Sequence, residues 1–346
     1  MVGNNRGLAA RAAWLSFIGG YTQEEIAQRL GLSRVKINRL IAEATEAGLV
    51  RVFVEGTAAE CVALEDQIAA HWKLDFCSVS PTVDGGLLPL RTLAAAGAHY
   101  LHGVLERGEA KVIGVGHGRT LDEIVKYLPR VERPDVKFVS LLGSLTRHAA
   151  ANPFDVIHRL SEVTAAECYF MPAPFFADSI ADKKVLLGQK GLKDVFALAK
   201  AAELYIVGIG EIGVHAHMLS TRTTTEKELR EVKQAGAVGE VLGRFLDKEG
   251  RVVAAELNDR AVAIKLEDIK GKPVIAIAGG ADKPQAIMAV LESRVISGLI
   301  TDEDTAKAIV DRINAGRINA GRINAGTKAG ETKKSKQNRW RGESHV

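Results

Sequence analysis

The stretch VIGVGHGRTLDEI, residues 112–124, decides the fold of most of this 346-residue chain. Its first residues are apolar without polar alternation, which is typical of a strand buried on both faces of a parallel sheet. Gly114, Gly116 and Gly118 follow, and Thr120 can open the helix that comes next. A strand, a glycine-rich turn and a helix in this order predict one unit of an α/β fold.

Similar units lie on both sides of this stretch. Strands that alternate with helices favour a Rossmann-like, mainly parallel sheet that is covered by helices on both faces. In such sheets, ligands bind at the carboxyl ends of the strands, against helix N-termini. The apolar runs lie at 76–81, 111–116, 137–143, 167–174, 203–210, 272–280 and 297–301, and helical stretches lie at 90–105, 120–128 and 283–293.

Three strand ends carry residues suited to a small, oxygen-rich ligand. The loop at 116–120 offers bare N–H groups and a hydroxyl, AIAGGADKPQAI (276–287) offers two glycines and a lysine, and LLGS (141–144) is a weaker third. Neither GxGxxG nor a Walker A sequence is present, which disfavours dinucleotides and nucleoside triphosphates. The alternative, that the glycines only permit tight turns, stays open. The candidates are Gly116, His117, Gly118, Arg119, Thr120, Gly143, Gly279, Gly280 and Lys283.

Two further segments have polar groups with an ordinary explanation. In GIGEIGVHAHM (208–218), Glu211, His215 and His217 could be acid/base groups or metal ligands, but no third ligand or nucleophile accompanies them. In the predicted turn and hairpin at 244–265, Asp247 and Asp259 could accept hydrogen bonds from sugar hydroxyls or simply stabilise the turn. We therefore predict no metal site, no cofactor and no catalytic residue.

The front of the chain has a different pattern. In YTQEEIAQRLGLSRVKINRLIAEATEAGLV (21–50), Thr22 and Glu25 form a capping box, so we expect a helix that ends near Leu30. Gly31 permits a tight turn, and Ser33 can cap a second helix. A helix at about 8–18 would complete a three-helix core, and RVFVE (51–55) alternates like the strand of a wing. The apolar positions of the second helix are Ile37, Leu40, Ile41 and Ala44.

The remaining residues of the second helix face outward near its N-terminus, as they do in a recognition helix. Such helices enter the major groove of DNA, where Arg, Lys and Asn read base edges or hold phosphates. We therefore predict double-stranded DNA as a partner; a plain helical hairpin with a solvated face is the alternative. The candidate DNA-binding residues are Thr22, Ser33, Arg34, Val35, Lys36, Asn38 and Arg39.

Charge and composition divide the chain into a head at 1–56, a joining helix at 57–74, a body at 75–311 and a tail at 312–346. The head has 7 basic and 5 acidic residues. The body with its joining helix has 30 basic and 35 acidic residues, and the tail has 9 basic and 2 acidic residues. Any contact with nucleic acid is thus expected at the two ends. The joining helix could form a dimer or be the first helix of the body. The tail repeats RINAG three times from residue 312; the first copy could finish a terminal helix, and we expect TKAGETKKSKQNRWRGESHV (327–346) to be disordered.

Composition also excludes several classes of protein. No apolar run reaches the roughly 20 residues that cross a bilayer, and the N-terminus lacks a secretory signal, so we expect a cytoplasmic protein. Cys61, Cys77 and Cys168 are far apart in sequence, and we expect three buried thiols.

Five motifs at matching intervals resemble the SorC-type sugar-binding transcriptional regulators over roughly residues 8–311. The motifs are AQRLGLSRVKINRLIAEATEAGLVRV, VIGVGHGRTL, AELYIVGIG, GAVGEVLGRFLDKEG and AIAGGADKPQAIMAVLESRVISGLITDEDTA. The resemblance implies a winged helix-turn-helix head, and a body similar to the ribose-phosphate isomerase and glucosamine-phosphate deaminase fold. It also implies a homotetramer and a sugar phosphate or polyol as effector.

At the matching positions, the resemblance assigns roles to single residues. Gly116, Gly118, Arg119 and Thr120 would cradle the anionic or hydroxylated end of the effector, Asp247 would hold a hydroxyl, and Lys283 would contact the ligand. His117 falls where the family varies. We therefore expect a regulator, most often a repressor in this family, of a carbohydrate or polyol operon. The rival is a sugar-phosphate isomerase or deaminase with an accessory DNA-binding head.

Overall fold

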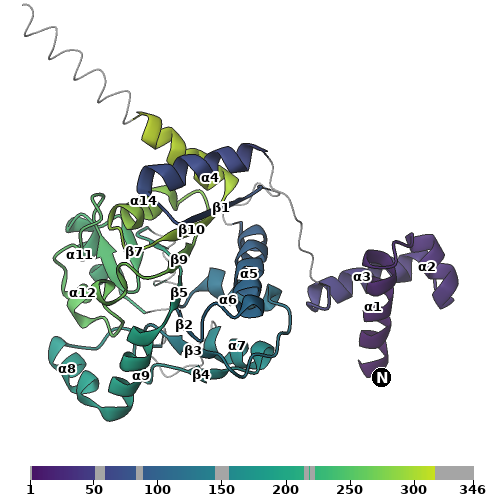
Figure 1. The fold of residues 1–346 in the computed structure, drawn as a ribbon, viewed down its shortest axis with the longest axis horizontal. Helices are drawn as coiled ribbons and strands as arrows, with labels where there is room; N and C mark the ends of the chain where they lie inside the picture. The colour runs from purple at the N-terminus through teal and green to yellow at the C-terminus, as the bar shows by residue number, and fades with distance from the viewer. Residues whose placement is uncertain are drawn as a thin grey trace, which may run out of the picture.

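The computed structural model describes residues 2–50, 59–82, 89–144, 156–213, 218 and 223–315. Its first part is a three-helix head made of α1 (Val2–Phe17), α2 (Gln23–Leu30) and α3 (Arg34–Glu46) (Figure 1). The first helix begins earlier than the expected residue 8 and ends at Phe17. The strand predicted at 51–55 lies outside the described residues.

Local capping signals set the ends of α2 and α3. Thr22 and Glu25 make both hydrogen bonds of the predicted capping box, and Gly31 ends α2 with a left-handed φ of 64°. The Ser33 side chain accepts a hydrogen bond from the backbone N–H of Lys36 at 3.3 Å and so caps α3. The core of the head consists of the buried residues Ala9, Ala12, Ala13, Leu15, Ile26, Ala27, Ile37, Leu40 and Ala44, with Ile41 half-buried beside them.

A seven-stranded parallel sheet forms the centre of the body (Figure 1). All seven strands predicted from apolar runs are present, in the spatial order β1-β10-β9-β5-β2-β3-β4. Every neighbouring pair is parallel. The strands are β1 (Phe76–Ser80), β2 (Val112–Val115), β3 (Lys137–Ser140), β4 (Glu167–Tyr169), β5 (Leu204–Val207), β9 (Val274–Ile277) and β10 (Gly298–Asp302).

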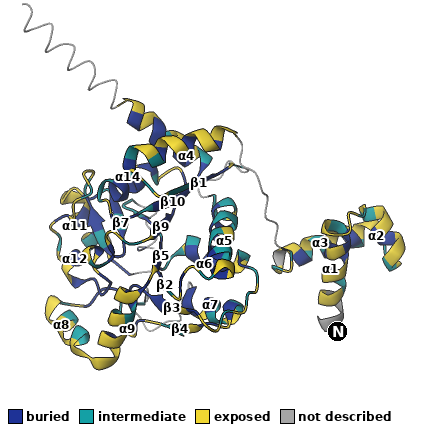
Figure 2. Cartoon of the chain, viewed as in Figure 1, coloured by how far each residue is buried: buried dark blue, intermediate teal, exposed yellow. Residues whose placement is uncertain are grey.

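Each face of this sheet is covered by helices, which explains why its strands lack polar alternation. In β5, Leu204 and Ile206 pack under one layer, while Tyr205 and Val207 pack under the other. Figure 2 shows the resulting buried band along the central strands. The first layer contains α5 (Leu90–Arg107), α6 (Arg119–Tyr127) and α7 (Val156–Thr164); the second contains α4 (Ala59–Trp72), α9 (Lys190–Ala201) and α14 (Pro284–Glu292).

A smaller antiparallel sheet was not expected as such. It contains β6 (Gly210–Glu211), β7 (Gly239–Val241) and β8 (Arg244–Leu246). The segment predicted as a hairpin at 244–265 therefore pairs mainly with the residues before it, although Leu246 also bridges to Val252. The remaining helices are α8 (Ile180–Gly188), α11 (Glu226–Gln234), α12 (Glu256–Arg260) and α13 (Leu266–Ile269).

The joining helix α4 packs onto the body through the stripe that its sequence predicted. Cys61, Leu64, Ile68 and Trp72 are all buried in the same core as α14 and β10. The indole N–H of Trp72 also donates to Glu292 Oε1 at 2.9 Å. The stripe is thus the inner face of the first helix of the body. Residues 303–315 form a further helix, which takes in residues 312–315 of the first RINAG copy.

The cysteines and the helix lengths bear on two other expectations. Cys61 is buried, whereas Cys77 and Cys168 are only partly buried, and all three are free thiols. Burial raises the pKa of the Cys77 thiol to about 12, so this thiol is protonated and unreactive at neutral pH. None of the helices in the described part of the chain has the length and hydropathy that a bilayer-spanning segment needs.

Candidate functional site

The strand order reverses between β2 and β5, and a cavity lies at this point. From β2 the chain proceeds outward through β3 to β4, whereas from β5 it proceeds through β9 and β10 in the opposite direction. The loops after β2 and β5 therefore diverge and leave a crevice at the carboxyl ends of the strands. Residues 116–121 and 208–211 line the cavity that occupies this crevice.

Six of the ten predicted effector residues line this cavity: Gly116, His117, Gly118, Arg119, Thr120 and Lys283. Gly118 is the N-cap of α6, with φ of 128°, and no side chain caps the helix there. The first N–H groups of a helix have no partner within the helix, so those of α6 are available to an oxygen-rich ligand. The ring of His117 extends toward β3, where its Nε2 lies 3.0 Å from Ser140 Oγ.

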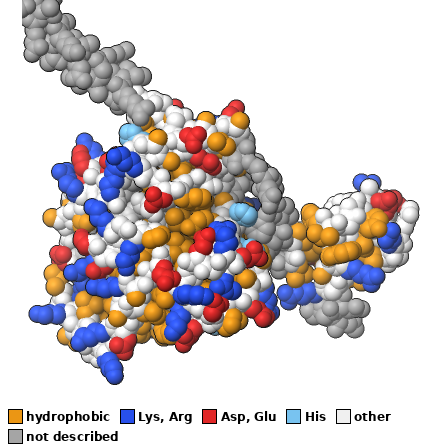
Figure 3. All heavy atoms as spheres, viewed as in Figure 1, with side chains coloured by type: hydrophobic (Ala, Val, Ile, Leu, Met, Phe, Trp, Pro, Cys, Tyr) orange, Lys and Arg blue, Asp and Glu red, His pale blue; other side chains and the backbone are white. Residues whose placement is uncertain are grey.

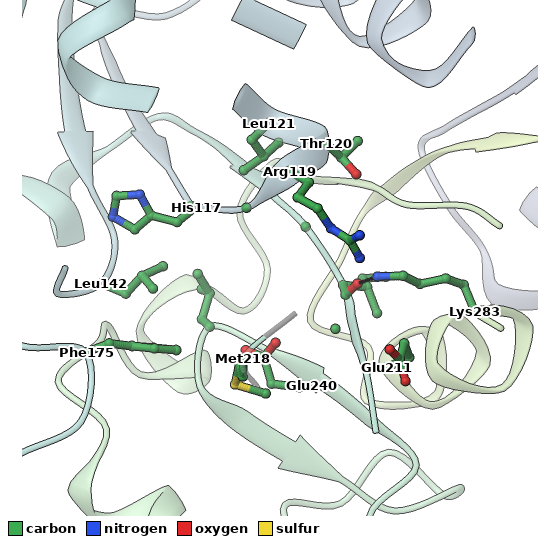
Figure 4. Close-up of a pocket in the computed structure, with 16 residues that line it drawn as sticks. His117, Arg119, Thr120, Leu121, Leu142, Phe175, Glu211, Met218, Glu240 and Lys283 are labelled. Atoms are coloured by element: carbon green, nitrogen blue, oxygen red, sulfur yellow. Dashed lines mark hydrogen bonds between the residues drawn. The ribbon is translucent and has the colours of Figure 1, made fainter. Parts of the chain in front are cut away.

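Charged side chains of both signs meet in the cavity. Figure 4 shows Arg119 and Lys283 on one side and the carboxylates of Glu211 and Glu240 on the other. Lys283 Nζ donates a hydrogen bond to the carbonyl of Ile209. Glu240 Oε1 accepts a hydrogen bond from the N–H of Gly243 at 2.5 Å. With two basic and two acidic groups, the formal charge of the site is balanced.

Burial shifts two of these groups toward their neutral forms. It raises the pKa of the Glu240 carboxyl, although the Gly243 N–H and the charges of Lys283 and Arg244 oppose the shift. It lowers the pKa of the Lys283 ammonium, although Glu211 and Glu240 oppose the shift. Both groups have lost water and gained only part of the hydrogen bonding they had in it. A ligand with several hydroxyls could replace that water.

Four predicted effector residues lie outside the cavity. The N–H of Gly143 donates to the carbonyl of Val262 at 2.9 Å. Asp247 accepts bonds from the N–H groups of Glu249 and Arg251, as a turn residue does. Gly280 donates to Asp302 and Thr305, and a Cβ at Gly279 would lie 1.9 Å from Asp302 Oδ2.

The glycines of the second loop therefore approach β10 closely, whereas Lys283 of the same segment lines the cavity. Gly114, which the sequence places with the first glycine loop, lies within β2. A Cβ at this position would lie 2.6 Å from the Leu141 side chain, so close packing explains this glycine too. His215 and His217 lie outside the described residues, and Asp259 is not among the residues that line the cavity.

Sequence reasoning missed several residues that line the cavity. Glu240 comes from β7, Phe175 from the segment after β4, and Met218 from a position beyond β6. Glu211 was considered only as an acid/base group or metal ligand. No motif joins these residues, because they converge from segments that are far apart in the chain. Among the described residues, no group of three or more His, Cys, Asp or Glu could hold a metal ion.

The second candidate site is the outer face of α3 in the head. Arg34, Val35, Asn38 and Arg39 are exposed there, whereas Lys36 is half-buried. Val35 has 80% of its surface exposed and lies among these polar side chains. The hydroxyls of Thr22 and Ser33 are engaged in helix capping.

Two interactions hold the polar side chains of this face. Gln23 Nε2 donates to Asn38 Oδ1 at 3.3 Å, which links α2 to α3. Arg39 Nε lies 3.1 Å from Glu43 Oε1, one turn further along α3. Gln23 was not predicted, because its role depends on the angle between the two helices.

Comparison with known proteins identifies the family. Residues 57–311 match a domain family described as "Putative sugar-binding domain". The erythritol catabolism regulatory protein EryD of Brucella abortus is 46% identical over 307 residues, covering 89% of this chain and 97% of that protein. The chain belongs to the SorC-type sugar-binding transcriptional regulators. A second member, the transcriptional regulator LsrR of an Enterobacter species, is 32% identical over 308 residues, covering 88% of this chain and 92% of that one.

Solved structures of SorC-type regulators share the fold. The full-length sorbitol operon regulator SorC of Klebsiella pneumoniae aligns with a TM-score of 0.67 at 23% identity, covering 88% of this chain and 98% of that one. The expected α/β architecture is thus confirmed. Because its relatives are named as regulators, this SorC-type chain is a transcriptional regulator and not an isomerase or deaminase.

Proposed function

We propose that this chain represses a carbohydrate or polyol catabolic operon by binding operator DNA through α3. The cavity between β2 and β5 binds an uncharged polyol or sugar, and this ligand changes the affinity for the operator. The observation that carries the proposal is the balanced set of Arg119, Lys283, Glu211 and Glu240 at the point where the strand order reverses.

The outer face of α3 supports the DNA-binding part of the proposal. Arg34 and Lys36 provide positive charge, and Val35 provides an apolar surface that suits the methyl group of thymine. Because Gln23 engages Asn38 Oδ1, the amide N–H groups of Asn38 are the part available to a base edge. Thr22 and Ser33 act indirectly, by holding the ends of α2 and α3.

The charges in the cavity support an uncharged effector over a phosphorylated one. Sugar hydroxyls can donate to Glu211 and Glu240 and accept from Lys283 and Arg119. Because the basic and acidic groups of the site balance, no net positive charge remains to hold the one or two negative charges of a phosphate group. Erythritol is the first compound to test, because the Brucella abortus relative is named for erythritol catabolism.

Assembly and location are further parts of the proposal. A homotetramer is the state that the family resemblance implies, and it would present paired heads to an operator with repeated half-sites; light scattering on the full chain measures it. Because the partner is genomic DNA, we place the protein in the cytoplasm.

Operator binding should respond to the effector. We expect wild-type protein to bind an operator selected from a random duplex pool, and erythritol or another free polyol to weaken binding by roughly 5- to 150-fold, the usual range of coupling between sites. Lys283→Met should bind the operator normally but lose the response. Fluorescence anisotropy with labelled duplex measures both. If no sugar, polyol or sugar phosphate altered the affinity for the operator, the proposal that this cavity regulates DNA binding would be wrong.

The choice between free and phosphorylated effectors depends on Glu240. Glu240→Gln keeps the size of the side chain and removes a carboxyl that can carry negative charge, so it should weaken polyol binding and favour a phosphorylated sugar by about tenfold. Isothermal titration calorimetry compares the two ligands. Glu231→Gln, an exposed carboxylate on α11, is the matched control and should change neither. Tight binding of a sugar phosphate to the wild-type cavity would instead establish the phosphorylated class.

A further inference from the structure

A second cavity, away from the effector site, gathers positive charge. It lies between α8, α9, β8 and the segment around α13, and five basic residues line it: Lys183, Lys193, Lys200, Arg244 and Lys265. Leu187 and Phe196 add apolar surface to its lining, and Asp268 is its one acidic lining residue. Figure 3 shows Lys and Arg side chains gathered at the lower left, over α8 and α9. The cavity shares no lining residue with the effector site.

Most of this charge has no direct counter-ion. Lys200 Nζ lies 3.1 Å from Asp268 Oδ2 and forms an ion pair. Lys183 Nζ instead donates to the carbonyl of Asp259 at 2.7 Å, and Arg244 donates to the carbonyl of Asn258 at 2.6 Å. Within the described ranges, no carboxylate forms an ion pair with Lys183, Arg244, Lys193 or Lys265.

Two of the five cationic groups, Lys183 and Arg244, have also lost water, whereas the three other lysines are exposed. Burial lowers the pKa of Lys183, and the nearby charges of Arg244 and Lys265 lower it further, with only Asp259 opposing. Burial also lowers the pKa of Arg244, although Glu267, Asp259 and Glu240 oppose this shift from a distance. Holding several positive charges together beside apolar surface costs free energy that a bound anion would offset.

We propose that this second cavity binds a small anion with at least two negative charges, such as a phosphate ester, whose uncharged part covers Leu187 and Phe196. The guanidinium of Arg244 presents a planar pair of donors suited to phosphate or carboxylate oxygens, and the lysines add flexible charges around it. The regulator would then sense an anionic metabolite at this cavity in addition to the effector between β2 and β5.

Pyrophosphate is the probe for this cavity, and isothermal titration calorimetry on the full chain is the measurement. Lys183→Gln with Lys193→Gln should weaken binding by roughly a hundredfold, on the order of tenfold for each lost charged contact. The matched control is Lys184→Gln with Lys190→Gln, since these exposed lysines lie in the same helices and do not line the cavity. The control should retain binding within about twofold, because distant surface charges are screened by salt.

Two further arms separate this cavity from the effector site and identify the anion. Lys283→Met should bind pyrophosphate as wild type does, even if the proposed effector role of Lys283 is wrong. Citrate in place of pyrophosphate tests carboxylates against phosphates as the preferred anion. The proposal is overturned if neither anion binds the wild-type protein. It is equally overturned if both double variants lose binding to the same extent, or if Lys283→Met is the variant that loses it.

Discussion

Replacing both Arg34 and Asn38 with alanine is expected to abolish specific operator binding without unfolding the head. Both side chains are exposed on α3, and neither belongs to the core formed by α1, α2 and α3. A good base contact contributes about 1–3 kcal/mol of discrimination, so the pair should cost roughly 2–6 kcal/mol if the contacts are independent. Binding to the selected operator and to random duplex, at one salt concentration, measures the loss.

The matched control removes the same kinds of side chain from other helices. Arg11→Ala with Gln28→Ala takes one exposed arginine from α1 and one exposed amide from α2. It should weaken specific and random DNA alike, since it removes only general attraction to phosphate. Gln23→Ala should reduce specificity less than Asn38→Ala, because it frees Asn38 Oδ1 but leaves the amide in place. Unchanged discrimination in the Arg34 and Asn38 variant would show that α3 does not read the operator.

Asp302→Ala should destabilise the body by about 2 kcal/mol or more, the order expected for one buried donor left without a partner. Asp302 is only 2% exposed and ends β10, the strand beside β9. Its carboxylate accepts hydrogen bonds from Gly280 N at 3.0 Å, Thr305 N at 3.0 Å and Thr305 Oγ1 at 2.6 Å. In the alanine variant Gly280 N keeps its hydrogen bond to Thr305 Oγ1, but the Thr305 N–H loses its partner, which costs about 1–3 kcal/mol for a buried donor. Urea denaturation of the full chain, followed by a probe in the body, measures the difference.

Two comparisons make this result specific. Asp302→Asn keeps one acceptor oxygen and should lose less stability than alanine. Asp304→Ala removes an exposed carboxylate two residues later and should change stability by less than about 0.5 kcal/mol. Effector affinity of the folded Asp302 variants should stay near that of wild type, since Asp302, Gly279 and Gly280 do not line the cavity. A strong loss of effector binding with normal stability would show that the second glycine loop contributes to the effector site after all.

The parts of the fold that depend on neighbouring residues could be predicted from the sequence. The capping box at Thr22, the turn at Gly31 and the cap at Ser33 act within a few residues of each other, and the structure confirms all three. The seven strands of the large sheet were predicted because a strand buried on both faces is continuously apolar. The strands of the small sheet, β6 to β8, have only two or three residues each, which is too short to show an apolar run of this kind.

The candidate sites divide in the same way. The loop at 116–120 was predicted because a strand, a glycine turn and a helix N-terminus follow one another directly in the chain. Glu240 and Phe175 were not predicted, because nothing near them in sequence indicates which strand end they approach. The glycines at 279–280 show the converse limit of sequence reasoning, since their loop has the residues of a ligand site but Asp302 of another strand holds its backbone.

The sequence by itself determined the strands of the large sheet, the ends of α2, the start of α3 and its polar face, and one wall of the cavity, since capping hydrogen bonds and side-chain patterns act over a few residues. Only the tertiary structure decided the other walls. The order in which strands pair reverses at β2 and β5, and this reversal brings Glu211, Glu240 and Lys283 together from separate segments. The balance of charge on which the proposed preference for a polyol rests arises from this convergence, because electrostatic interactions depend on distance in space and not on separation along the chain.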